Sequence, residues 1–142
     1  MKLTKTIFAI LCVVITLSNC SNPGPSSQRQ KSPEELRMEL KQLEKSRPTD
    51  YLFASGNYRE NFWGDKFKVS CTITNKASVA TYKDAVIRVI YYSKTKTELG
   101  AKDYTIYELF TPSSAKTVEM TVDNYKDVNS IGLKVFSAVP VE

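Results

Sequence analysis

Two stretches of the chain alternate between apolar and polar residues, and this alternation restricts the possible fold more than any other feature. In residues 67–74 every second side chain is apolar, namely Phe67, Val69, Cys71 and Ile73. Residues 85–92 place a second apolar set on one face: Ala85, Ile87, Val89 and Tyr91. On the opposite face of that stretch, Arg88 indicates at least partial contact with water. A period of two is typical of β-strands that bury one face.

The rest of the chain after residue 51 continues this pattern. Further short strands are expected in residues 102–110, 116–122 and 130–141, with no helical segment between them. The side chains expected to point inward on the last two strands are Val118, Met120, Val122, Ile131, Leu133 and Val135. We therefore predict that residues 51–142 form a mainly β domain, a two-sheet antiparallel β-sandwich. At 142 residues, of which 42% are hydrophobic, one domain with its own core is expected.

The segment "GDKFKVSCTITNKASVATYKDAVIRVIYYSKTKTELG" and the later "YTIYELFTPSSAKTVEM" resemble the FxLYD-type immunoglobulin-like domains of bacterial envelope proteins. The positions that carry the resemblance are Asn75, Val89, Tyr91, Tyr92 and Pro112. The resemblance implies an immunoglobulin-like fold, but it brings no catalytic residues and no common ligand. Lys96 stands where a glycine would relieve a left-handed turn.

One short α-helix is expected before the domain, in residues 32–47. Ser32 and Glu35 have the spacing of a capping box, and Pro48 would end the helix. Along the helix, one narrow apolar stripe is formed by Leu36, Leu40 and Leu43. This stripe would pack either on the following domain or on a partner.

The N-terminus has the features of an export signal. Lys2 and Lys5 precede an apolar run in residues 7–17, which is too short for a transmembrane helix of about 20 residues. Leu17-Ser18-Asn19-Cys20 resembles the lipobox of bacterial lipoprotein signal peptides. The resemblance implies cleavage of residues 1–19 and a lipid anchor on Cys20, so the membrane would be one partner. Residues 20–31 would then be a flexible, Pro- and Ser-rich tether.

This reading implies a lipid-anchored location in the cell envelope. Ser21 is not Asp, the residue that in many bacteria retains lipoproteins at the inner membrane. The outer membrane is therefore expected rather than the inner one, and exposure at the cell surface stays open.

Several chemistries lack the residues that they need. Histidine is absent, so neither its general-base role nor its metal-ligand role is available. Ser113 and Lys116 form a Ser-x-x-Lys motif, but they lie in an expected loop without the further elements of acylating enzymes. Cys71, the one thiol left after Cys12 is removed and Cys20 is acylated, is expected to be a small buried hydrophobe. We expect no catalytic residue, no metal site and no cofactor.

The charge balance also argues against nucleic acid. The full chain carries a net charge of +5, and without Lys2 and Lys5 the balance is 18 basic to 15 acidic residues. This surface is too weakly basic for a polyanion partner.

Aromatic residues are the remaining candidates for a binding surface, because Tyr and Trp are enriched in interaction hot spots. The candidates for partner binding are Trp63, Tyr92, Tyr104, Tyr107 and Phe110. Each of them could instead complete the core. We expect a non-catalytic binding module that holds a protein or glycan partner near the membrane. The alternative is a structural or assembly subunit that docks through the leucine stripe.

Overall fold

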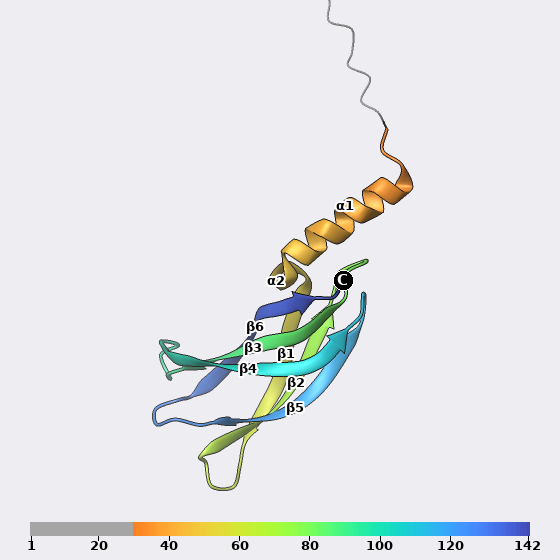
Figure 1. The fold of residues 1–142 in the computed structure, drawn as a ribbon. Coiled ribbons are helices and arrows are strands. Elements are labelled where there is room, and N and C mark those ends of the chain that lie inside the picture. Colours follow the sequence, from red (N-terminus) through yellow and green to blue (C-terminus); the bar gives the residue numbers. More distant parts are fainter. Residues whose placement is uncertain (1–29) are drawn as a thin grey trace, which may run out of the picture. The chain divides into compact units, whose positions relative to one another are not determined.

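The computed structural model describes residues 30–142, which form two helices and six β-strands (Figure 1). The helices are α1 (Pro33–Ser46) and α2 (Pro48–Tyr51). The strands are β1 (Leu52–Glu60), β2 (Lys66–Asn75), β3 (Tyr82–Tyr92), β4 (Glu98–Phe110), β5 (Ala115–Asp123) and β6 (Ser130–Pro140). The predicted signal segment, the anchor at Cys20 and the tether as far as residue 29 lie outside the described residues.

The six strands form two three-stranded sheets in which every pairing is antiparallel. The first sheet has the order β1-β2-β5 and the second has the order β4-β3-β6. One hydrophobic cluster draws its buried residues from both sheets. The mainly β sandwich is thus confirmed, and its immunoglobulin-like character stays a prediction.

The alternation in the sequence predicted the buried faces correctly. On β2 and β3 the residues expected to point inward are all buried, whereas Arg88 on the opposite face is half-buried. On β5 and β6, Val122, Ile131 and Val135 are buried, and Val118, Met120 and Leu133 pack against the cluster from its margin.

The turn between β3 and β4 confirms the expectation for Lys96. The Ser93 N–H donates to the Thr97 carbonyl at 2.9 Å, and Lys96 adopts a φ of +65°. This left-handed conformation costs a non-glycine residue about 1 kcal/mol.

The first strand, β1, was not anticipated as a separate element. It pairs with β2 alone and is exposed along most of its length, so its sequence lacks a clear alternation. Gly56 lies at its centre, where a Cβ atom would stand 2.1 Å from the Ser70 carbonyl oxygen. Only a glycine permits this close approach of the two backbones.

Asn75, at the end of β2, joins two loops at one end of the sandwich. Its side-chain nitrogen donates to the carbonyls of Ala80 at 3.0 Å, Phe110 at 2.9 Å and Thr111 at 3.1 Å. Its side-chain oxygen accepts from the Ala77 N–H at 2.9 Å. The β2–β3 loop and the β4–β5 loop are therefore held by one fully buried amide.

Cys71 is a free, buried thiol on β2. Burial raises the pKa of this thiol to about 11, so it stays protonated at neutral pH. Its interpretation as a small core hydrophobe is confirmed.

Replacing Asn75 should destabilise the domain strongly. In Asn75→Ala the Ala77 N–H and the carbonyls of Ala80 and Phe110 lose their bond to Asn75, whereas the Thr111 carbonyl keeps the Ser114 hydroxyl. We expect a loss of about 3 kcal/mol in the free energy of unfolding. Urea denaturation followed by circular dichroism measures it. Asn57→Ala, at an exposed position on β1, is the control, with an expected change within about 0.5 kcal/mol. Equal losses in the two variants would refute the role assigned to Asn75.

Candidate functional site

Helix α1 is attached to the sandwich by a carboxylate near its C-terminal end. One oxygen of Glu44 accepts from the Ser78 N–H at 2.7 Å, and the other accepts from Val79 at 2.9 Å and Ala80 at 2.8 Å. The Tyr82 hydroxyl donates to the Glu44 carbonyl at 2.8 Å. Glu44 is only 1% exposed, so the last turns of α1 are fixed on the β2–β3 loop.

Two opposing effects set the charge of the Glu44 carboxylate. Burial is the largest single influence and raises its pKa, whereas the three backbone N–H donors together lower it. The donors prevail, and the pKa of Glu44 lies below its ordinary value. The Glu44 carboxylate therefore carries a full negative charge at neutral pH. We call this carboxylate and the three backbone N–H groups that it binds the Glu44 clamp.

The start of α1 is as predicted. The Ser32 side chain accepts from the Glu35 N–H at 3.2 Å, and the Glu35 carboxylate accepts from the Ser32 N–H at 2.8 Å. This reciprocal capping box fixes the first turn, with Pro33 directly after the cap.

The leucine stripe of α1 is exposed. Leu36 is 53% exposed, Leu40 37% and Leu43 46%, so the stripe does not pack on the domain. Of the two alternatives for this stripe, packing on the following domain is wrong. The physical reason is that α1 meets the sandwich only at its C-terminal end, where Glu44 is its one buried residue, and otherwise projects away from the sheets, which leaves the leucines without a covering surface (Figure 1).

The second exposed apolar feature is the turn between β1 and β2. Phe62 is 93% exposed and Trp63 81%, and their rings meet edge to face with centroids 5.2 Å apart. The turn is well ordered by hydrogen bonds: the Asn61 N–H donates to the Lys66 carbonyl at 2.9 Å, and Gly64 adopts a φ of +72°. The predicted binding residues include Trp63 but not Phe62, although the two are neighbours in a polar turn.

The five predicted aromatic residues do not form one surface. Trp63 lies in the β1–β2 turn and Tyr107 is exposed on β4, whereas Tyr92 and Tyr104 are half-buried. Phe110 is completely buried, and its inclusion in a binding surface was wrong. It is separated from Tyr104 by an even number of residues, so both side chains point from β4 into the core.

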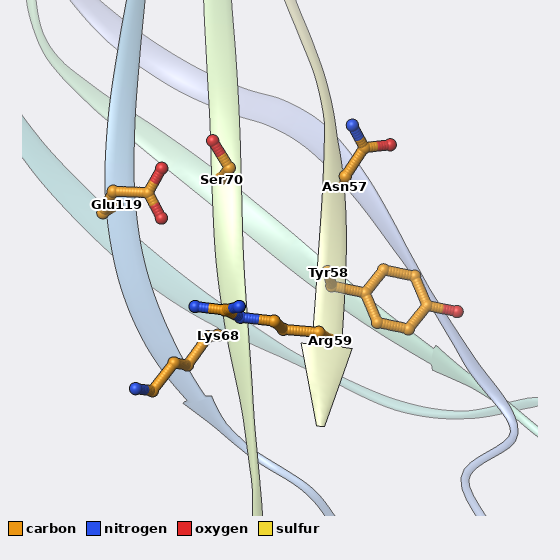
Figure 2. Close-up of a pocket in the computed structure, with 6 residues that line it drawn as sticks. All are labelled: Asn57, Tyr58, Arg59, Lys68, Ser70 and Glu119. Carbon is orange, nitrogen blue, oxygen red and sulfur yellow. The ribbon is translucent and has the colours of Figure 1, made fainter. Parts of the chain in front are cut away.

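A hollow of about 270 Å³ lies against the first sheet, with lining residues on β1, β2 and β5 (Figure 2). The lining side chains are Asn57, Tyr58, Arg59, Lys68, Ser70 and Glu119. They include hydrogen-bond donors and acceptors, and they carry both positive charge, on Arg59 and Lys68, and negative charge, on Glu119. Glu119 is the one carboxylate among them, so the hollow holds no carboxylate pair of the kind that acid–base hydrolysis needs.

Neither helix in residues 30–142 has the length and hydrophobicity of a membrane span, and this part of the chain holds no group of three or more His, Cys, Asp or Glu side chains placed to bind a metal ion. Comparison of the chain with family models, with curated proteins and with solved structures found no match.

The Glu44 clamp should make stability depend on pH in the acid range. Because its pKa is lower in the folded state, Glu44 contributes stability above its unfolded pKa of about 4.3, and that stability is lost as the pH falls through the folded pKa. We expect Glu44→Gln to lose about 2 kcal/mol at pH 7, because the neutral amide is a weaker acceptor and places a donor against a backbone N–H.

Urea denaturation at pH 7 and at pH 3 measures this difference. The difference in the free energy of unfolding between the wild-type protein and Glu44→Gln should be smaller at pH 3 than at pH 7. The matched control is Glu39→Gln on the exposed part of α1, which should change stability little at either pH. The same difference in the free energy of unfolding at both pH values would contradict the stabilising role of the ionised Glu44 carboxylate.

Proposed function

We propose that this chain is a membrane-anchored bacterial lipoprotein whose sandwich is a non-catalytic interaction module of the cell envelope. The lipobox-like residues 17–20 support the anchor, and the strand pattern of residues 64–120 supports an FxLYD-type domain. The observation that carries the interaction role is the exposed leucine stripe on a helix that is itself firmly attached. The docking alternative, a subunit that assembles with another envelope protein through this helix, is the one that this observation favours.

The stripe suits a protein partner better than a lipid surface. It is only one leucine wide, at positions i, i+4 and i+7, and this spacing matches the seam between two packed helices. Amphipathic helices that lie on bilayers have a broad apolar face with a cationic border. Here the neighbouring positions carry both signs, with Glu39 in an ion pair with Lys31, so the border has no cationic excess to attract anionic lipid. A helix or apolar groove of another envelope protein is therefore the proposed occupant.

The tether would keep this surface close to the membrane. Residues 21–31 can span at most about 35 Å when extended. A partner of α1 would thus be a membrane protein or another anchored protein.

A second candidate surface is the Phe62–Trp63 turn. Two adjacent, highly exposed aromatic rings on an ordered turn are suited to insertion into a concave apolar pocket of a partner. The turn lies at the end of the sandwich opposite α2, so it is a surface separate from the leucine stripe (Figure 1).

Site-specific photocrosslinking in intact cells tests the docking role of α1. A photoreactive phenylalanine analogue at position 40, on the stripe, should give one discrete crosslinked species. The same analogue at position 38 is the matched control, because Met38 is 67% exposed but lies about half a turn away from the stripe. Leu36→Ser combined with Leu43→Ser should abolish the species without unfolding the sandwich. Equal crosslinking at positions 38 and 40 would refute docking through the stripe.

Mass spectrometry of the protein purified from membranes tests the anchor. We expect a mature chain that begins at Cys20 and carries a diacylglyceryl group, and we expect Cys20→Ser to release the protein from the membrane fraction. An unmodified chain that begins at Met1 would overturn the lipoprotein proposal.

A further inference from the structure

β1 is an edge strand with one unpaired side. It hydrogen-bonds with β2 on its other side, and no further strand in residues 30–142 pairs with it (Figure 1). Its nine residues, Leu52–Glu60, keep a continuous register with β2, without a bulge. A long and regular edge of this kind presents unpaired N–H and C=O groups to any further strand.

Hydrogen bonds just beyond each end of β1 show which of its backbone groups point away from β2. The Asn61 N–H donates to the Lys66 carbonyl at 2.9 Å, and the Lys76 N–H donates to the Tyr51 carbonyl at 2.8 Å. Hydrogen-bonded residues alternate along an antiparallel pair, so the odd-numbered residues of β1 direct their N–H and C=O groups to β2. The even-numbered residues direct theirs to the open side.

The open side is accessible along the half of β1 that leads to the β1–β2 turn. At the other end Leu52 is buried, and its N–H already donates to the Pro48 carbonyl in α2. From residue 56 to residue 60 every residue is exposed. The outward N–H and C=O groups of Gly56, Tyr58 and Glu60 form no hydrogen bond within residues 30–142.

The other three edges of the two sheets are better protected. Ion pairs join β4 of one sheet to β5 of the other, Lys102 to Asp123 at 2.7 Å and Lys116 to Glu108 at 2.8 Å. β6 ends in Pro140, and its register with β3 shifts twice. Charged side chains, proline and bulges are features that prevent strand addition at an edge, and β1 has no lysine, proline or bulge.

We propose that β1 pairs with β1 of a second copy of this chain, antiparallel and about a two-fold axis at Tyr58. The accessible half of the edge, residues 56–60, is centred on Tyr58, so the two copies overlap over all of it. The result is one continuous sheet of six strands, in the order β5-β2-β1-β1-β2-β5. Two-fold pairing of identical edges closes the contact, because neither β1 keeps an open side along this half.

The side chains of β1 favour this occupant because they complement themselves. In this register Asn57 of one copy lies opposite Arg59 of the other. Glu60 lies opposite Gly56, so no like charges oppose each other. Within one chain Arg59 lies opposite Lys68 on β2, with its side chain directed over that strand, and it forms no ion pair within residues 30–142 (Figure 2). Rotation toward the Asn57 amide of the second copy would move the guanidinium away from this like charge.

Sedimentation equilibrium of the full-length protein in density-matched detergent micelles tests the proposal, and we expect a reversible dimer. Asn57→Lys, which opposes Arg59 with a like charge, should weaken the dimer about 5-fold, since each change occurs twice in a two-fold interface. Asn57→Asp should tighten it about 5-fold for the same reason. The matched controls are Thr121→Lys and Thr121→Asp, at an exposed position of β5 on the same face of the sheet, which should leave the dimer unchanged.

Tyr58→Pro is an independent test, because it removes an outward N–H and leaves the hydrogen bonds to β2 in place. It should abolish the dimer while the circular dichroism spectrum keeps its β-sheet form. Leu40→Ser, on the leucine stripe, should leave the dimer intact. A monomer at every concentration, equal responses to the changes at Asn57 and Thr121, or loss of the dimer in Leu40→Ser would overturn the proposal.

Discussion

Three backbone N–H groups in the β2–β3 loop depend on one carboxylate that comes from outside the sandwich. Buried backbone groups need partners, and this short loop can form no strand ladder of its own. Glu44 supplies the acceptor for Ser78, Val79 and Ala80, and Asn75 accepts from Ala77. Asn75 also donates to the β4–β5 loop, so α1 and both loops belong to one buried polar network. The position of α1 therefore follows from the hydrogen-bonding needs of a loop.

Through this network α1 is attached by a buried carboxylate, whereas an amphipathic helix is usually attached by its apolar stripe. Such a helix normally buries its apolar stripe and leaves its charged face in water. In α1 a charged residue is buried and the leucines are exposed. Exposed apolar residues in a row have a free-energy cost that a covering partner would remove. The reversal is the physical reason for assigning the docking role to α1, since the domain has already been joined to the helix by other means.

Local patterns predicted the parts of this fold that depend on local physics. The alternation of apolar and polar residues predicted the buried faces of β2 and β3, and the Ser32–Glu35 spacing predicted the start of α1. The contacts of Glu44 could not be predicted, because its partners lie 34 to 36 residues away and a Glu on a helix ordinarily faces water. Phe110 was misjudged because its even spacing from Tyr104 places both side chains on one face of β4 without telling which face is buried.

The clamp at Glu44 also has a mechanical consequence. In a chain tethered at residue 20, tension reaches the sandwich covalently through α2 into β1, which is an edge strand paired with β2 alone. An edge strand pulled from one end is peeled away, and its hydrogen bonds break one after another. Glu44 offers a second path for the load, into the β2–β3 loop, through bonds that must break together. Under the anchoring proposed for Cys20, the sandwich can thus bear a pull from the membrane that would otherwise unzip its first strand.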